Sequence, residues 1–437
     1  MNDAYSLDTI VALCKRRGFV FPSAEIYGGL NGVYDFGPLG TTMRENIRTV
    51  WKKHILKDKN TIEFLEGALL GPQQMWEASG HLQNFSDPMV DCTNCKKRFR
   101  SDENDIDLTK PCKHCGVRAW TDIRQFQMMF KTDLGAVSES AHTAYLRPET
   151  AQAIFTNFKN ILSTSRVKIP FGIAQIGKAF RNEITPKQFL FRMREFEQME
   201  LEFFCKESDS DHFFNYWVEQ RRSFYDNIGL TSNRIRIRTH EKTELAHYSK
   251  NTADLEYQFP FGWKELEGIA NRGTFDLSQH SAHSGKDLSV YDDTTKSSYI
   301  PAVIECSVGV DRLFLTLLFD AYHQEEIEDD TRVVLKLSSH IAPIQIAILP
   351  LSKQLDEPAE HMYLDLRRKG FRCQFDTSGS IGKRYRRQDE IGTPFCITYD
   401  FESKNDLKVT IRDRDTLLQD RIAIDQVESY LKNKFVN

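Results

Sequence analysis

Residues 171–204 hold the pattern that most constrains the fold of this chain. Apolar and charged residues alternate there as in two strands, on either side of a Thr-Pro pair that predicts a turn. Because side chains alternate faces along a strand, Arg192, Phe196 and Glu200 would share one face of the second strand. The other face is apolar except for two acids, one of them Glu197. We therefore predict a buried antiparallel hairpin that displays a cation, an aromatic ring and an acid on one side.

The charged face suits a nucleotide. An arginine fork matches phosphate oxygens, a phenylalanine ring can stack on a purine, and a carboxylate can accept a hydrogen bond from an amino group. The first strand would add Arg181 and Glu183 to this face, behind the small residues Gly177 and Ala179, which leave room for a ligand. The alternative is an antiparallel sheet held by ion pairs without a ligand, and the pattern alone leaves both open.

Length, charge and cysteine usage limit what can surround this hairpin. At 437 residues the chain is too long for one hydrophobic core, so we expect two or three domains. A net charge of −4 gives no overall attraction to nucleic acid, so any RNA contact needs a local basic patch. The sequence has no leader pattern, no membrane-spanning apolar run, and several scattered cysteines. We therefore predict a cytoplasmic protein with reduced thiols that does not associate with membranes.

Hydrophobic periodicity outlines two regions. The first has helices predicted at 5–18, 39–56, 149–162 and 309–322, helical sequence to about 228, and strands at 233–239, 254–260, 264–270 and 299–308. The acidic stretch 324–331 then predicts a linker. Beyond it strands and helices alternate, which predicts a small mixed α/β domain.

Four cysteines form two closely spaced pairs within a polar, loop-rich stretch at about 88–120 that looks inserted. The spacing Cys92-x2-Cys95-x16-Cys112-x2-Cys115 predicts a zinc ribbon. Four thiolates leave no open coordination position, so this metal would be structural. A redox pair or a degenerate site that binds no metal is the alternative.

Three motifs resemble those of class II aminoacyl-tRNA synthetases. Arg181-x-Glu183 followed by Arg192-x3-Phe196-x3-Glu200 is similar to the second motif of that class. PAVIECSVGVDRLFLTLL (301–318) resembles the third motif, a strand followed by Gly-x-x-Arg at the start of a hydrophobic helix. DFGPLG (35–40), before an amphipathic helix, resembles the first motif, which forms the dimer.

Longer stretches narrow the resemblance. RPETAQ (147–152), KELEGIANR (264–272) and GSIGKRYRRQDEIGTPF (379–395) look like the single-chain, homodimeric glycyl-tRNA synthetases of class IIa, and the similarity runs from about residue 5 to 435. The resemblance implies an α+β fold with an antiparallel sheet core flanked by helices. It implies a catalytic domain at 1–335 that carries the zinc ribbon, and an anticodon-binding domain of mixed α/β structure at 336–437.

The resemblance also implies roles at matched positions, with Arg181 and Arg312 as catalytic residues. The implied ATP-binding residues are Arg181, Glu183, Phe191, Arg192, Phe196, Glu265, Leu266, Gly309 and Arg312. The implied glycine-binding residues are Arg100, Glu149, Phe196, Gln198, Glu200, Glu305 and Ser307. Arg181 would grip the α-phosphate, Glu265 would help hold Mg²⁺, and Arg100 would bind the glycine carboxylate.

The implied activity is ligation of glycine to tRNA(Gly). ATP-dependent formation of glycyl-adenylate would precede transfer to the tRNA 3′ end, with Mg²⁺ and structural Zn²⁺ as cofactors and a homodimer as the assembly. Two alternatives are a non-catalytic synthetase-like protein that binds nucleic acid and a class IIa synthetase for serine, proline or threonine. Pairing of Glu149 with Glu200 suits an amino acid without a side chain.

A basic run in the C-terminal region has two interpretations. Lys383, Arg384, Arg386 and Arg387 could form a phosphate patch or a solvated helix face, and their charge does not separate the two. The resemblance to anticodon-binding domains favours the phosphate patch.

Overall fold

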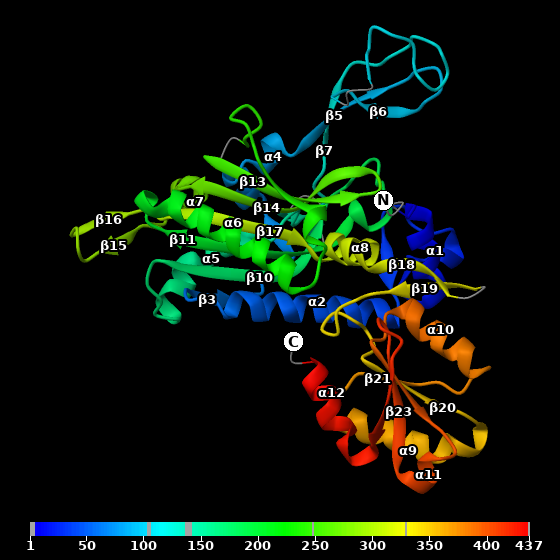
Figure 1. Cartoon of the computed structure of the whole chain (residues 1–437). Helices are drawn as coiled ribbons and strands as arrows, with labels where there is room; N and C mark the ends of the chain where they lie inside the picture. The colour runs from blue at the N-terminus through cyan, green and yellow to red at the C-terminus, as the bar shows by residue number, and fades with distance from the viewer. Residues whose placement is uncertain (1–4, 103–105, 136–141, 247–248, 328–329, 436–437) are drawn as a thin grey trace.

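The computed structural model describes residues 5–102, 106–135, 142–246, 249–327 and 330–435 (Figure 1). Its main body is built on a seven-stranded sheet with the strand order β12-β13-β14-β17-β11-β10-β3. In that order the strands are β12 (Ile235–Thr239), β13 (Asn251–Phe259), β14 (Gly262–Gly273), β17 (Ala302–Gly309), β11 (Glu195–Cys205), β10 (Phe171–Phe180) and β3 (Thr61–Phe64). Neighbouring strands are antiparallel except β10 and β3, which are parallel. The predicted antiparallel core is confirmed.

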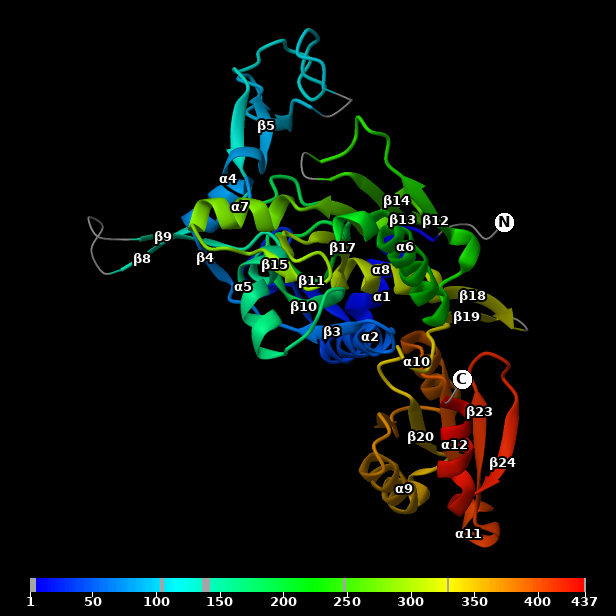
Figure 2. The ribbon, with the colours of Figure 1, turned by 90° about the vertical axis from the view of Figure 1, so that its left-hand side faces the viewer.

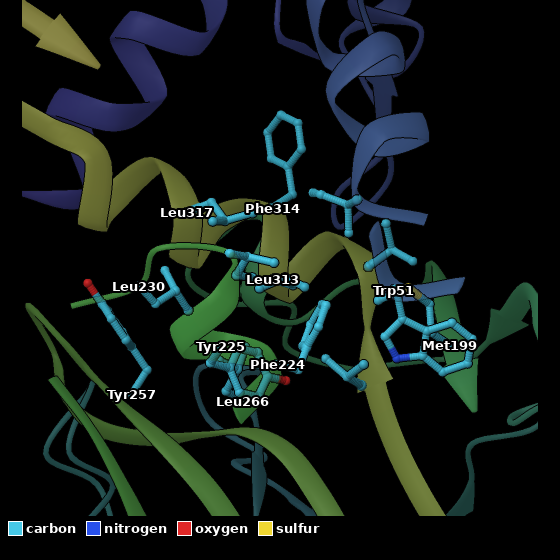
Figure 3. Close-up of a cluster of buried hydrophobic side chains, with 14 of the residues drawn as sticks. Trp51, Met199, Phe224, Tyr225, Leu230, Tyr257, Leu266, Leu313, Phe314 and Leu317 are labelled. Atoms are coloured by element: carbon cyan, nitrogen blue, oxygen red, sulfur yellow. The ribbon is translucent and has the colours of Figure 1, made fainter. Parts of the chain in front are cut away.

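Helices cover both faces of this sheet. They are α1 (Leu7–Arg17), α2 (Pro38–Leu56), α5 (Ala151–Thr164), α6 (Ser210–Asn227), α7 (Phe275–Ser284) and α8 (Val310–Ala321). Figure 3 shows one apolar cluster, in which Trp51 from α2, Phe224 from α6 and Leu313 from α8 lie near Met199 of β11. On the opposite face of β11, Phe204 packs with Phe158 of α5. The alternation predicted for this strand therefore places its apolar side against α2, α6 and α8.

The connection between β10 and β11 differs from the prediction. β10 ends at Phe180 and β11 begins at Glu195, so the predicted placement of Arg181, Glu183 and Arg192 within the strands is wrong. These three residues lie in the loop between the strands.

Contacts from distant parts of the chain and a short helix shape this loop. It contains a 3-10 helix at Phe189–Phe191, and the middle residue of that helix is buried. Arg194 fastens the end of the loop, since its Nε donates to the carbonyl of Glu183 (2.9 Å) and its Nη1 donates to the carbonyl of Asn31 (2.9 Å). The turn signal in the sequence therefore marks a bend within a longer loop.

The acidic stretch at 324–331 is also not a linker. β18 (Tyr322–Ile327) and β19 (Asp330–Leu335) pair as an antiparallel hairpin, and residues 328–329 lie outside the described residues. Two cations offset the charge of Glu325, namely Arg332 of β19 (2.6 Å) and Lys336 just after that strand (2.7 Å).

Smaller elements surround the main sheet. The cysteine pairs lie in an excursion with three strands, β5 (Ser86–Asp91), β6 (Arg98–Arg100) and β7 (Arg124–Gln127), ordered β6-β5-β7. A separate three-stranded sheet has the order β4-β9-β8, with β4 (Leu70–Pro72), β9 (His142–Leu146) and β8 (Lys131–Leu134). The short helices α3 (Gln73–Ala78) and α4 (His81–Asn84) lie between β4 and β5 in the chain. Two further hairpins pair β1 (Val20–Pro22) with β2 (Tyr34–Phe36), and β15 (Val290–Asp292) with β16 (Ser297–Tyr299).

The C-terminal region has its own five-stranded sheet. The order is β21 (Cys373–Phe375), β20 (Ile346–Pro350), β22 (Phe395–Tyr399), β23 (Lys408–Asp413) and β24 (Gln419–Ala423). Its helices are α9 (Asp356–Arg368), α10 (Ile381–Ile391), α11 (Ser403–Asp406) and α12 (Val427–Phe435). The first three strands are parallel and the others antiparallel, which confirms the mixed α/β prediction.

One helix of this region faces the rest of the chain. Figure 2 shows α10 next to the β18–β19 hairpin. The side chain of Arg332 joins them, because it is buried and its Nε donates to Asp389 of α10 (2.8 Å). Across the described residues, no helix has the length and apolar character needed to cross a membrane.

Candidate functional site

A cavity of about 410 Å³ opens at the ends of β11, β14 and β17 and the start of α8. This volume is within the range of small-molecule sites. Its lining includes every predicted ATP residue, namely Arg181, Glu183, Phe191, Arg192, Phe196, Glu265, Leu266, Gly309 and Arg312. It also includes the predicted glycine residues Glu149, Gln198, Glu200, Glu305 and Ser307. The structure thus gathers residues from four separate stretches of sequence around one space.

Two arginines of the cavity are oriented by backbone carbonyls and aromatic rings. Nε of Arg181 donates to the carbonyl of Pro148 (3.1 Å), and its guanidinium carbon lies 5.2 Å from the centre of the Phe196 ring. Neither Nη atom of Arg181 has a hydrogen-bond partner among the described residues. The guanidinium of Arg312 lies over Phe191 at 4.5 Å. Stacking fixes the plane of each guanidinium and leaves its charge available to an anion.

Arg312 also pairs with an acid of the cavity. Its Nη1 donates to the carbonyl of Glu265 (2.9 Å) and to the carboxylate of the same residue (3.0 Å). The helix that carries Arg312 begins at Val310, which confirms its predicted place in the first turn.

The other end of the cavity is acidic. Glu149 accepts from Gln152 (2.9 Å) and lies 3.3 Å from Nε2 of His81. Glu200 accepts a hydrogen bond from the hydroxyl of Thr150. Glu305 accepts from Arg272 (2.8 Å). The three carboxylates, one buried and two partly buried, thus outnumber the cations beside them, so this end attracts a positively charged group.

The surroundings shift the pKa values of two of these acids in opposite directions, raising that of Glu200 and lowering that of Glu149. Burial raises the pKa of Glu200 to about 8, and the charges of Glu305 and Glu149 add to this. Burial acts the same way on Glu149, but His81 and Arg272 outweigh it and hold its pKa well below the ordinary value. Glu149 therefore carries its charge at neutral pH, whereas Glu200 gains full charge only when a cation arrives or the pH rises.

The glycine predicted to leave room for a ligand serves another purpose. A Cβ atom at Gly177 would lie 2.1 Å from Nη2 of Arg147. Arg147 donates to the carbonyl of Gly67 (2.9 Å) and to Gln175 (3.0 Å). The small residue therefore accommodates a buried arginine of the framework, which corrects the prediction.

Arg100 does not join the cavity. It lies on β6, and its guanidinium contacts Asp87 (3.1 Å) and Asp102 (2.8 Å). Conversely, the structure adds lining residues that the sequence did not indicate: Leu190, Met193, Gly268, Arg272 and Asp311. Two of them carried a usable signal, since Gly268 and Arg272 lie in the stretch KELEGIANR.

The four cysteines converge as a possible metal centre. Sγ of Cys92 lies 3.6 Å from Sγ of Cys115, and Sγ of Cys95 lies 3.8 Å from Sγ of Cys112. A tetrahedral zinc with metal–sulfur distances of about 2.3 Å requires sulfur atoms about 3.8 Å apart, so the four thiols fit this metal. Each pair closes the same backbone turn, because Lys96 N–H donates to the carbonyl of Cys92 and Gly116 N–H donates to the carbonyl of Cys112 (both 2.8 Å).

Known protein families match both the main body of the chain and its C-terminal region. Residues 130–322 match a model of the tRNA synthetase class II core domain (G, H, P, S and T), and residues 345–434 match a model of the anticodon-binding domain. A glycine–tRNA ligase of Caldanaerobacter subterraneus is 53% identical over 98% of each chain. One of Geobacillus thermodenitrificans is 50% identical over 99% of this chain and 98% of its own, and one of Alkaliphilus oremlandii is 49% identical over 98% of each.

Proposed function

This chain belongs to the glycine–tRNA ligase family, and on that premise we propose that it charges tRNA(Gly) with glycine in two steps. In the first, the glycine carboxylate attacks the α-phosphate of ATP, which forms glycyl-adenylate and expels pyrophosphate. In the second, a hydroxyl at the tRNA 3′ end takes the glycyl group and AMP leaves. The single observation that carries this proposal is a cavity with stacked arginines at one end and surplus carboxylates at the other.

The arginine end would bind ATP. We assign Arg181 and Arg312 as the catalytic residues, which stabilise the negative charge that develops on the phosphates during attack. Phe196 would stack on adenine, and Glu183 would accept from its amino group. Arg192 would join Arg312 at the outer phosphates, while Phe191, Leu266 and Gly309 complete the walls. Adenylate formation needs charge stabilisation more than proton transfer, which fits a site rich in arginine.

The acidic end would bind the glycine ammonium group through Glu149, Glu200 and Glu305. Gln198 and Ser307 lie beside them, with Nε2 of Gln198 donating to the Ser307 hydroxyl (3.3 Å). A larger amino acid would have to push a side chain into this ring of polar groups and leave them without partners, which costs about 1–3 kcal/mol for each buried polar group. We do not assign a role in glycine binding to Arg100, which lies outside the cavity.

Two metals have distinct places in this proposal. Mg²⁺ would accompany ATP, and Glu265 is the carboxylate of the cavity wall that would help hold it and offset phosphate charge. Zn²⁺ would fill the tetrahedron of Cys92, Cys95, Cys112 and Cys115 and hold the excursion together, with no open position for chemistry.

The C-terminal region would read the anticodon, and the structure divides its basic run. Arg384 is buried and donates to the carbonyl of Pro350 (2.6 Å), so it is structural. Arg387 binds Asp376 (2.7 Å). Lys383, Arg386 and Arg387 line a cavity of about 560 Å³ that Arg17 of α1 also lines. Arg386 pairs there with Asp330 (2.7 Å), and Arg17 pairs with Glu390 (2.5 Å). We propose that these cations contact RNA phosphates at the junction of the two regions.

We further propose that the protein is a cytoplasmic homodimer. The helix α2 lies in the motif that resembles the dimer-forming one, and the connection between β1 and β2 holds Ile26 and Tyr27 with 88% and 86% of their surface exposed. A second copy would cover such apolar side chains. A domain boundary near residue 335 completes the proposal.

Pyrophosphate exchange with each of the twenty amino acids tests this function directly. Glycine should drive exchange in the presence of ATP and Mg²⁺, whereas alanine and serine should not. Equal exchange with serine, proline or threonine would favour a synthetase for another amino acid. No exchange with any of them, together with retained RNA binding, would favour a non-catalytic accessory protein.

A further inference from the structure

One buried carboxylate of β11 has no hydrogen-bond partner among the described residues. Glu202 of β11 is completely buried, and neither of its oxygens has a hydrogen-bond partner in the described structure. It follows Glu200 on the same face of the strand and lies behind the cavity, whose lining does not include it. Neither the ATP cavity nor the proposed glycine contacts therefore accounts for this residue.

Its surroundings are themselves acidic. Glu305 of β17 lies directly across from Glu202 in the strand pairing, and one oxygen from each of Glu200, Glu202 and Glu305 lies within 4.8 Å of the others. From the other packed elements, Arg272 of β14 and Asp276 of α7 face this group, and Arg272 donates to both Glu305 (2.8 Å) and Asp276 (2.7 Å). On the β10 side the neighbour in register is the apolar Ile173.

A second buried glutamate of this sheet provides a contrast, because its carboxylate has hydrogen-bond donors. Glu267 of β14 is equally buried, but Arg221 donates to one of its oxygens (2.6 Å) and the hydroxyl of Tyr225 donates to the other (2.5 Å). Both oxygens of Glu267 thus have a donor. Neither oxygen of Glu202 has one among the described residues.

An ionised carboxylate with no donor, next to two more acids, is too unfavourable to persist in a protein interior. Burial raises the pKa of Glu202 well above the ordinary value, and the charges of Glu305 and Glu200 raise it further. The group must therefore hold a proton or a bound cation. Arg272 already offsets Glu305, and a neutral carboxylic acid needs no additional ion.

We propose that Glu202 carries a proton at neutral pH and acts as a positioning residue, donating a hydrogen bond to the carboxylate of Glu305. This inference rests on the proposed glycine site. The hydrogen bond orients Glu305 toward the glycine ammonium group. It also separates two acids that would otherwise repel each other across the strand pair.

Two substitutions of Glu202 separate its possible roles. Glu202→Gln keeps a neutral donor of the same shape, whereas Glu202→Leu keeps the volume and removes the donor. In pyrophosphate exchange, E202L should raise KM for glycine by about 10- to 100-fold with little change in KM for ATP, because a hydrogen bond to a charged group is lost. E202Q should recover the KM for glycine to within about threefold of wild type between pH 6 and 8.5.

Other results would overturn the inference. If E202Q raised KM for glycine as much as E202L, Glu202 would be a charged group or a cation ligand. If E202L matched wild type, it would have no positioning role. Absence of glycine-dependent exchange in the wild-type protein would instead refute the proposed function, so the two failures are distinguishable.

A matched control and a spectrum cover the case in which E202L does not fold. Glu267→Gln should lower the melting temperature, because it leaves Arg221 buried without a counter-charge, while E202Q should leave the melting temperature unchanged or raise it. The infrared difference between wild type and E202Q at pH 7 should contain the C=O band of a protonated carboxylic acid. A difference that contains only carboxylate bands would refute the proton on Glu202.

Discussion

The proposed division into two domains is tested by two truncations that end at residues 335 and 344. A cut at 335 follows the end of β19, whereas a cut at 344 keeps the segment that leads to the C-terminal sheet. Leu337, Ile341 and Ala342 in this segment are buried in the same apolar cluster as Trp51 of α2. Asn46 of the same helix donates to the carbonyls of residues 341 (3.1 Å) and 342 (3.0 Å).

The expected difference between the two chains follows from this burial. Burying a leucine or isoleucine side chain contributes about 1.5–3 kcal/mol, so removing Leu337 and Ile341 should cost about 3–6 kcal/mol. Domains of this kind are stable by about 5–15 kcal/mol in total. Both truncations lose the contact of Arg332 with Asp389, so that loss cancels in the comparison. The chain that ends at 344 should therefore be folded, and the one that ends at 335 should be close to unfolding.

Melting curves and two activity assays check this expectation. The chain ending at 344 should melt cooperatively and retain glycine-dependent pyrophosphate exchange, because every proposed ATP and glycine residue precedes the cut. It should transfer little glycine to tRNA, since recognition of unpaired anticodon bases is lost. Equal melting temperatures for the two truncations would refute the packing argument. Charging of tRNA at the full-length rate would show that the C-terminal region does not read the anticodon.

Four further substitutions test the cavity and the cysteine site separately. Arg181→Ala and Arg312→Ala should each lower pyrophosphate exchange by about 10²–10³-fold at an unchanged melting temperature, and near-normal exchange in both would exclude them from catalysis. Cys112→Ser should release about one zinc per chain by metal analysis and make residues 88–120 sensitive to protease, and wild type that resists protease without metal would contradict the ribbon. Because the pKa of Glu200 rises from 4.5 to about 8 on folding, the native state holds a proton that the unfolded chain releases, and stability falls as pH rises between these values. In urea unfolding, the free energy of unfolding of Glu200→Gln relative to that of wild type should therefore increase from pH 5 to pH 8.5, by at most about 4–5 kcal/mol. An equal difference between the two proteins at both pH values would contradict the raised pKa.

Elements with a strong period were predictable because their pattern is local. The helix α8 and the strand β17 follow from one apolar run, and both occur within three residues of their predicted ends. The linker predicted at 324–331 was wrong because Arg332 and Lys336 offset the charge of Glu325 within a hairpin. Composition alone does not show such pairing. The strands predicted to include residues of the 181–194 loop were wrong for a similar reason, since Arg194 fastens this loop to the carbonyl of Asn31, far away in sequence.

The predicted cavity residues line the cavity despite these errors, because they were assigned by their positions in the motifs and not by secondary structure. Arg192 moves from a strand to a loop and still lines the cavity. Arg100 shows the limit of that argument, because it lies on a separate small sheet whose position the motifs do not encode. Glu202 was missed because a sequence shows that an acid is present but not that its partners are absent.

The acid at Glu197, which interrupts the apolar face of β11, shows how the three motifs form one site. Arg44 of α2 contacts both Glu197 (2.7 Å) and Asp311 of α8 (3.1 Å), and the backbone N–H of Glu197 donates to the same aspartate (2.8 Å). The residues next to these two acids in sequence, Phe196 and Arg312, line the cavity, as does Asp311, whereas Glu197 does not. Because neighbouring side chains on a strand or in a first helical turn diverge, one residue of each pair can join the framework while the other meets the ligand. Glu197, which interrupts the apolar face of β11, is therefore a buried link. It connects α2, the helix proposed for the dimer interface, to the start of α8, which carries the proposed catalytic residue Arg312.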